Sequence, residues 1–401
     1  MSISSRPNQS WQRWAPGGFC LLIFLIITAD VVRHPLKHTT MPTYRLASTQ
    51  WWAGQDAYST NAHAGFLYFP QAAFLFSPFN ALPFLAGEIL WRAATFGLFF
   101  YALVRLNDFF LSTPRQPAGK TFLILCLLAV PSALASLRNA QFDLPVAALI
   151  VLTAAEIASA RWTVATAWLC LALALKPLAM VPLLLFGALY GKLIPRLLIG
   201  LLIVAALPFL HWNPAFVAHE YVRCFETLIW AAKGDEARYS DLAALLTHFG
   251  CDAPESLKTV ARVLFALIFL GLGVAAVRRL DRIDAAWAVG ALSADYLMLF
   301  NPRTETCSYV FLGPFVASLA LFYAAQPGRK GLAWLLGLAT LGLACDAFPK
   351  IGHFSIHDMT DRWFKPLLAL LFLPVLIQFI FETRAVAIST RSDPVIPTGA
   401  E

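Results

Sequence analysis

Long apolar runs, separated by short polar segments, occupy most of the chain between residues 15 and 381. An α-helix that crosses the hydrocarbon core of a bilayer needs about 20 predominantly apolar residues, and these runs approach that length. Candidate spans lie at 15–32, 86–106, 121–137, 144–160, 162–175, 177–191, 195–211, 259–277, 284–300, 308–324, 331–347 and 364–381. The pattern predicts an all-α fold, a polytopic membrane protein of about 12 transmembrane helices.

One apolar stretch, residues 162–192, could form either one bent helix or two short helices. Lys176 and Pro177 stand at its middle. Proline lacks a backbone donor and disfavours helix at the residue before it. We therefore expect two helices that meet at Lys176.

Basic residues recur in every second short loop, as at Arg105, Arg161 and Arg278. Short basic loops remain in the cytoplasm, so the pattern predicts cytoplasmic termini. The first apolar run lacks a cleavage pattern before Asp30 and is expected to stay as a signal anchor in an inner (plasma) membrane. The long loops are then non-cytoplasmic, that is, periplasmic or extracellular: 30–85, 212–258, 301–307 and 348–363.

The segment from Asp30 to Phe84 is too polar and too rich in proline to span a bilayer, and too aromatic for a solvated linker. Its rings suit the headgroup layer, where ring faces are buried and polar tips stay wet. These rings are Trp51, Trp52, Tyr58, Tyr68 and Phe69. We predict a large amphipathic first outer loop beside a lipid-soluble substrate.

Composition supports a membrane protein, because 59% of the residues are hydrophobic and 13% are charged, against roughly 25% charged in soluble domains. The formal charge of +7 is spread over short loops, which suits membrane lipids as partners and no nucleic acid. We expect a single membrane domain over residues 1–384 and a disordered cytoplasmic tail over residues 385–401.

The chain lacks the sequence motifs of several enzyme classes. No Walker motif, GxSxG elbow or GxGxxG fingerprint is present, which argues against nucleotide hydrolysis and soluble nucleotide-sugar donors. His353 and His357 are four residues apart but lack a zinc-binding motif, so we expect no metal and no cofactor. An oxidising compartment could pair some of the cysteines in or near the outer loops, Cys224, Cys251, Cys307 and Cys345.

Two carboxylates in the first outer loop are candidate bases. Asp30, at the outer end of the first span, is either a helix-end carboxylate that faces water or a general base beside the membrane. Asp56 follows Gly54, a pairing that favours a turn, with a base role as the alternative.

The polar segment 138–143 joins the third and fourth spans. It can serve only as a loop and helix cap. Alternatively, Asn139 and Gln141 hydrogen-bond sugar hydroxyls while the guanidinium of Arg138 binds a phosphate.

Further charges have two interpretations each. Lys176 either extends to the outer surface or contacts a phosphate, and Arg303 either pairs with Glu305 or neutralises a lipid phosphate. Asp241 either caps a short helix or binds substrate. Asp295 lies inside a span, where a lone carboxylate requires a partner.

Several segments resemble, in order, the polyprenyl-phosphate-mannose-dependent mannosyltransferases of the GT-C superfamily of integral membrane glycosyltransferases. The first loop and following helix contribute YRLASTQWWAGQDAY, FLYFPQAAFLFSPFNALP and GEILWR. RNAQFDLPVAALIVL resembles the family's Gly-Gln-x-Asn stretch, LALALKPLAMVPLLL its Lys-Pro helix pair and NPRTETCSYVFLGP its late outer loop. ARYSDLAALL stands where relatives carry an Asn-Gln-Ser-Leu-like segment.

The chain departs from that family at two places. Relatives carry an acidic residue shortly before the Tyr-Arg segment, where this chain has Thr39, Thr40 and Met41. Asp30 is then the nearest upstream carboxylate. In the Gly-Gln-x-Asn stretch, Ala140 replaces the glycine and Asp143 the asparagine.

The resemblance implies a GT-C-like fold and transfer of a hexose, mannose first, with inversion. The donor would be a polyprenyl-phosphate sugar, and the acceptor a hydroxyl linked to a lipid or glycan. Asp30 would be the base, with Asp56 as the alternative. The implied substrate-binding residues are Tyr44, Arg45, Trp52, Arg138, Asn139, Gln141, Lys176, Asp241 and Arg303.

Two other functions fit parts of the pattern. A lipid or small-solute transporter would suit the many spans, although no internal repeat is visible. A non-catalytic membrane subunit of the same fold would explain the missing acidic residue near Thr40.

Overall fold

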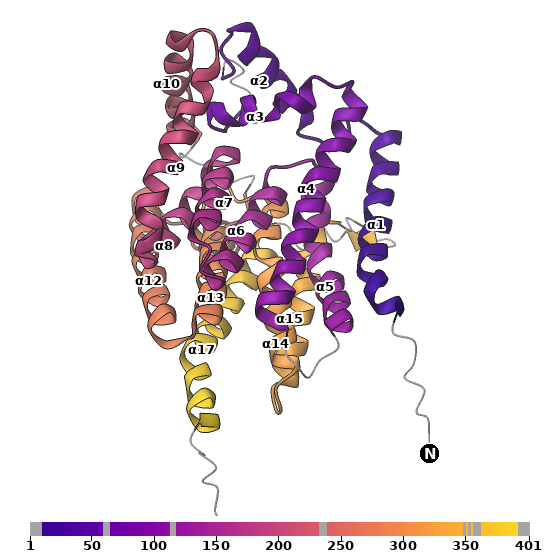
Figure 1. Ribbon diagram of the computed structural model, residues 1–401, viewed down its shortest axis with the longest axis vertical. Helices are drawn as coiled ribbons and strands as arrows, with labels where there is room; N and C mark the ends of the chain where they lie inside the picture. The colour runs from indigo at the N-terminus through magenta and orange to yellow at the C-terminus, as the bar shows by residue number, and fades with distance from the viewer. Residues whose placement is uncertain are drawn as a thin grey trace, which may run out of the picture.

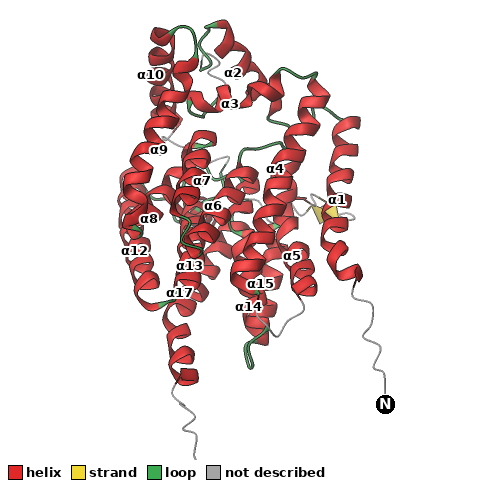
Figure 2. Cartoon of the chain, viewed as in Figure 1, coloured by secondary structure: helices red, strands yellow, loops and turns green. Residues whose placement is uncertain are grey.

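The computed structural model describes residues 10–58, 65–112, 118–231, 239–347, 350–351, 354–355 and 362–391. Within these residues the chain is helical apart from one two-residue antiparallel pair, β1 (Lys350–Ile351) and β2 (Phe354–Ser355) (Figure 2). The α-helices are α1 (Ser10–Arg33), α2 (Met41–Ala53), α3 (Pro70–Asn80), α4 (Phe84–Leu106), α5 (Ala118–Arg138), α6 (Asp143–Ala158), α7 (Trp162–Leu175), α8 (Met180–Leu189), α9 (Ile194–Ala206), α10 (Pro214–Ala231), α11 (Leu242–His248), α12 (Glu255–Arg279), α13 (Arg282–Phe300), α14 (Gly313–Ala324), α15 (Lys330–Leu343) and α17 (Phe364–Arg391).

Short helical turns of other kinds extend or join these helices. A π-helical turn, η1 (Asn107–Leu111), continues α4. The 3₁₀ turns are η2 (Pro177–Ala179), η3 (Gly191–Leu193), η4 (Leu207–Leu210), η5 (Thr306–Phe311) and η6 (Cys345–Ala347).

Eight helices of the described residues are long and apolar enough to cross a membrane. They are Trp14–Arg33, Phe84–Leu111, Gly119–Arg138, Gly191–Leu210, Glu255–Arg279, Arg282–Phe300, Thr306–Ala324 and Phe364–Glu382. The predicted all-α polytopic fold is therefore confirmed, but the predicted number of about 12 spans is not reached. Each predicted range falls on a helix, but α7 has 14 residues and rises only about 21 Å, which is less than the hydrocarbon core.

Burial separates the helices into an interior and a lipid-facing group. Every residue of α6 is buried, and α13 is nearly so. By contrast, α1, α9 and α12 direct large apolar side chains outward, among them Leu22, Leu202 and Val263. Apolar faces of this extent are stable only against lipid, so the protein is a multi-pass membrane protein.

The predicted break at Lys176 is confirmed. Helix α7 ends at Leu175, Lys176 is extended with φ −149° and ψ 128°, and Pro177 begins the turn η2. The break leaves a lysine at the junction of two apolar helices.

The first outer loop contains α2 and α3, which lie at one end of the helical bundle (Figure 1). The start of α1 and the end of α17 lie at the opposite end, as expected for termini that share one side of the membrane. The headgroup assignment was wrong for Trp51 and Tyr58, which are buried within the protein, whereas Tyr68 is partly buried. Trp52 is 38% exposed, because it lies on the outer face of α2.

The C-terminal segment, two histidines and the cysteines were also subjects of sequence-based expectations. Helix α17 continues to Arg391, inside the predicted tail of residues 385–401, and residues beyond it lie outside the described part. His353 and His357 also lie outside the described residues. All seven cysteines are free thiols in this structure.

Candidate active site

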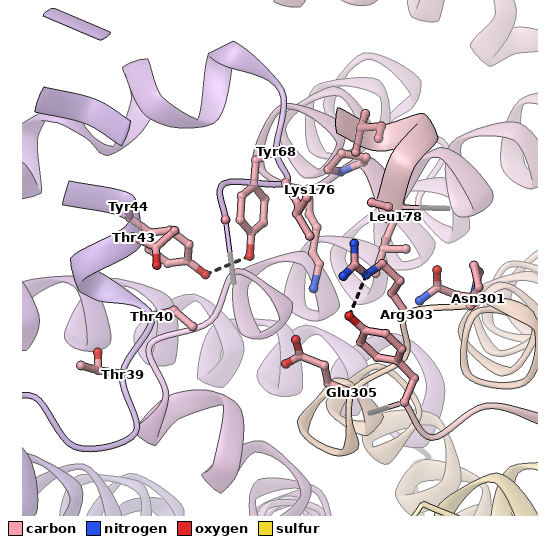
Figure 3. Close-up of a pocket in the computed structure, with 17 residues that line it drawn as sticks. Thr39, Thr40, Thr43, Tyr44, Tyr68, Lys176, Leu178, Asn301, Arg303 and Glu305 are labelled. Atoms are coloured by element: carbon pink, nitrogen blue, oxygen red, sulfur yellow. Dashed lines mark hydrogen bonds between the residues drawn. The ribbon is translucent and has the colours of Figure 1, made fainter. Parts of the chain in front are cut away.

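A cavity of about 500 Å³ lies where the first outer loop meets the ends of α7, α10 and α13. Its described lining combines cations, hydroxyls, one carboxylate and an apolar side (Figure 3). The lining residues are Thr39, Thr40, Thr43, Tyr44, Gly65, Leu67, Tyr68, Lys176, Pro177, Leu178, Leu228, Ala231, Tyr239, Asn301, Pro302, Arg303 and Glu305. Of the predicted site residues, the structure brings Tyr44, Lys176 and Arg303 together here.

Lys176 is held by an ion pair with Asp143. Its Nζ lies 2.5 Å from Oδ1 of Asp143, which is fully buried and also accepts a hydrogen bond from Ser308 Oγ at 3.2 Å. An ammonium group carries three N–H donors, so two remain for a ligand. Figure 3 shows the ammonium pointing into the cavity. In place of the predicted extension to the outer surface, Lys176 forms an ion pair with a buried carboxylate, and 17% of the lysine side chain stays exposed.

Arg303 does not form the ion pair with Glu305 that was one of its two predicted roles. No ion pair among the described residues includes Arg303. Its Nε donates to the hydroxyl of Tyr239 at 2.8 Å, and its guanidinium lies over the rings of Tyr239 and Trp230. The Nη1 atom is buried without a hydrogen-bond partner in the described part of the chain.

Tyrosine and threonine hydroxyls form the opposite wall. The hydroxyls of Tyr44 and Tyr68 are 3.1 Å apart, and Figure 3 shows both reaching into the space beside Lys176. Burial raises the pKa of both tyrosines well above its usual range, so both remain neutral donors and acceptors. Neutral hydroxyls of this kind suit the hydroxyls of a sugar.

The segment between α5 and α6 supports this wall rather than lining the cavity. The backbone carbonyl of Asn139 accepts hydrogen bonds from the nitrogen and hydroxyl of Thr40, both at 2.9 Å. The Gln141 amide donates to Glu305 Oε2 at 2.6 Å. Neither residue is among the described lining residues, and their sugar contacts stay predictions.

Ala140 stands at a position whose backbone conformation favours glycine. Its φ is +57°, a left-handed conformation that costs a residue with a Cβ about 1–2 kcal/mol. Its carbonyl accepts a hydrogen bond from Trp91 Nε1 at 2.9 Å, which helps to hold the turn.

The two predicted bases lie outside the cavity lining. Asp30 Oδ2 accepts a hydrogen bond from Arg138 Nε at 3.0 Å. Asp56 accepts from the backbone nitrogen of Tyr58 at 2.7 Å, as expected for a turn, and pairs with Arg223 of α10 at 3.1 Å. Arg138 is therefore engaged with a carboxylate in this structure.

The remaining predicted contacts also lie elsewhere. Arg45 donates to the carbonyls of Phe79, Asn80 and Leu82 at the end of α3. Trp52 Nε1 donates to Ser77 Oγ at 2.7 Å. Asp241 caps α11 by accepting from the nitrogen of Ala244 at 3.0 Å, which is the helix-cap role anticipated for it.

Sequence reasoning missed several cavity residues, among them Tyr68, Tyr239, Asn301 and Glu305. The usable signal was the segment NPRTETCSY, whose carboxylate was considered only as a partner for Arg303. Asp295 was expected to have a partner, but both of its carboxylate oxygens are buried without one in the described residues.

The family model of glycosyltransferase family 87 matches residues 66–302, more than half of the chain. No curated protein matches the chain.

Proposed function

The chain belongs to glycosyltransferase family 87, a GT-C family of polyprenyl-phosphate-mannose-dependent mannosyltransferases, and from this premise we propose its reaction. It moves a hexose, with mannose as the first candidate, from a polyprenyl-phosphate sugar to an acceptor hydroxyl on a lipid or glycan. Transfer takes place on the non-cytoplasmic side of the inner membrane, with inversion at the sugar carbon.

The observation that carries this proposal is the pair of cations in the cavity. Among the described residues, two N–H donors of Lys176 and the buried Nη1 of Arg303 have no hydrogen-bond partner. A buried donor without a partner costs about 1–3 kcal/mol, and a phosphate oxygen would satisfy it. Arginine and lysine together suit a phosphate group.

The apolar side of the cavity supports a donor that is a lipid. Leu67, Leu178, Leu228 and Ala231 form this side, and the last two belong to α10. Another face of α10 is exposed and apolar, with Val222 and Ile229 among its side chains, as in helices that lie at a membrane surface. A polyprenyl chain could therefore remain in lipid while its phosphate enters the cavity.

The chemistry follows from these contacts. The acceptor oxygen attacks C1 of the sugar, the bond from C1 to the phosphate oxygen breaks, and the electron pair leaves with the phosphate. Negative charge grows on the leaving oxygen, so Lys176 and Arg303 stabilise the transition state more than the bound donor. One direct displacement inverts the configuration at C1. Tyr44 is placed to hydrogen-bond the sugar.

The base predicted at Asp30 or Asp56 stays a prediction. Both carboxylates are held by arginines and neither lines the cavity.

A transfer assay tests the proposed reaction. Purified protein in lipid nanodiscs is incubated with a panel of polyprenyl-phosphate hexoses and membrane lipid extract, and the anomeric configuration of the product is read by NMR. We expect transfer from the mannose donor, with inversion. Absence of transfer from every donor, with folded protein, would contradict the proposal.

Cys251 offers a test of sidedness. It is the exposed cysteine of the described chain and lies between α11 and α12, at an expected non-cytoplasmic loop. A membrane-impermeant maleimide should label it in intact cells, and Cys251→Ser should abolish that labelling. Labelling only after the membrane is opened would reverse the proposed orientation.

A further inference from the structure

The cavity has one carboxylate among its described lining residues, that of Glu305, and no histidine. A general base must come within hydrogen-bond reach of the proton that it removes. The Thr40 hydroxyl, on the other wall, is occupied as a donor to the carbonyl of Asn139. Among the described lining residues, Glu305 alone combines the required chemistry with a place on the wall.

The two oxygens of Glu305 have different surroundings. Oε2 accepts hydrogen bonds from Gln141 Nε2 at 2.6 Å and from Cys307 Sγ at 3.4 Å. Oε1 has no hydrogen-bond partner among the described residues, and no ion pair there includes Glu305. One oxygen is thus fixed while the other is free to accept a proton.

The side chains that hold this carboxylate, those of Gln141 and Cys307, are buried. Gln141 is 7% exposed, and its own Oε1 accepts from Cys307 Sγ at 2.8 Å. The Glu305 carbonyl accepts from the nitrogen of Ser308 within the turn η5. Glu305 itself is exposed, so an acceptor can approach it from the aqueous side.

We propose that Glu305 is the general base of the transfer reaction, with Gln141 as the residue that positions it. This inference rests on the proposed function. Figure 3 shows the carboxylate pointing into the space that Lys176 also faces. A sugar–phosphate held by Lys176 and Arg303 would therefore present C1 near an acceptor hydroxyl bound at Glu305.

The step is balanced. The acceptor O–H bond breaks, its proton passes to Oε1 of Glu305, and the acceptor oxygen forms a bond to C1. The bond from C1 to the phosphate oxygen breaks at the same time, and the polyprenyl phosphate leaves with the electron pair. Glu305 then releases its proton to solvent on the open side of the cavity.

The decisive variant is Glu305→Gln, which keeps the size of the side chain and an oxygen for the Gln141 amide. We expect kcat to fall by about 100-fold or more, while KM for the polyprenyl-phosphate mannose donor changes by less than about threefold. The matched control is Glu226→Gln, whose carboxylate pairs with Arg223 on the surface of α10. The control should keep the wild-type kcat.

The pH profile gives a second readout. The acidic limb of kcat/KM should be present in the wild type and absent from the residual activity of Glu305→Gln. The charged and titratable groups near Glu305 are Lys176, Arg303, Asp143, Tyr68, Cys307, and the Lys365–Asp346 pair that holds the carbonyl of Thr306. None of them is changed by the substitution.

Each outcome decides the inference. Wild-type transfer with an undiminished Glu305→Gln variant overturns the base role and leaves the proposed function intact. A loss confined to Asp30→Asn returns that role to Asp30 and likewise overturns it. No transfer by the wild type would overturn both. If Glu305→Gln fails to fold, Glu305→Asp is tested in its place. We expect kcat of this variant to fall by about 10- to 100-fold while the acidic limb of the pH profile is retained. A wild-type kcat in Glu305→Asp would refute the base role.

Discussion

Substitution of Lys176 by methionine separates the two roles that the structure gives to this lysine. Its Nζ lies 2.5 Å from Asp143, whose side chain is fully buried. The same ammonium faces the cavity. A single substitution therefore removes an ion-pair partner and a phosphate contact together, whereas a second substitution at Asp143 restores only the charge balance.

The expected magnitudes differ for stability and for activity. Removal of one partner from a buried ion pair costs about 3–5 kcal/mol, because the remaining carboxylate is left without compensation. Asp143→Asn in the same chain should recover at least about 2 kcal/mol of this loss. A charge-assisted hydrogen bond to phosphate contributes about 1.5–3 kcal/mol, so kcat/KM for the donor should stay about 10- to 150-fold low in the double variant.

The assay combines unfolding in mixed detergent micelles with transfer kinetics in nanodiscs. The matched control is Arg105→Met with Glu156→Gln, at the other end of α6. That ion pair has an N···O distance of 2.7 Å, and Arg105 is 17% exposed, the same as Lys176. Arg105→Met alone should lose less stability than Lys176→Met, because Arg161 also pairs with Glu156 and the carboxylate keeps a partner. Both control variants should keep the donor KM.

Two results would refute this reasoning. If the double variant at Lys176 and Asp143 recovers wild-type kcat/KM, then the lysine serves only its ion pair. If Lys176→Met has the same free energy of unfolding as the wild type, then the ion pair is well solvated, in contrast to what the burial of Asp143 indicates.

Three further predictions follow from single groups. Arg303→Met should raise the donor KM about 10-fold or more. The free energy of unfolding should change by no more than about 1 kcal/mol, because the loss of one hydrogen bond to Tyr239 is offset by removal of a donor without a partner in the described residues. A large loss of stability with unchanged KM would contradict this prediction. Burial raises the pKa of Glu220 in α10 from 4.5 to about 7, so its contribution to stability is complete below pH 4.5 and is lost as pH rises through 7, by about 3 kcal/mol at most. Unfolding of wild type and Glu220→Gln across this window should differ in slope, and parallel curves would refute the assignment. Asp241→Ala should cost about 1 kcal/mol of stability through loss of the α11 cap without a change in donor KM; a tenfold rise in KM would favour substrate binding instead.

The helices and their break were predictable because the responsible forces act locally. Apolar length identifies a helix that must be shielded from water, and each predicted range falls on a helix. Proline at position 177 ends α7 whatever surrounds it. The number of membrane crossings was less accessible, because a buried apolar helix such as α6 and a lipid-facing one such as α9 have similar sequences.

The site itself was decided by tertiary structure. The side chain of Lys176 faces the cavity and not the outer surface because it pairs with Asp143, 33 residues earlier in the chain. Glu305 accepts a hydrogen bond from Gln141, which is 164 residues away in the chain. Asp30 was predicted as the base from its position at a helix end, but the fold brings Arg138 to it. Sequence alone therefore determined which polar residues are costly near lipid. Only the tertiary structure decided which of these residues form hydrogen bonds within the protein and which keep a donor or an acceptor for a ligand. The reason is that their partners are distant in the chain and are brought near only by folding.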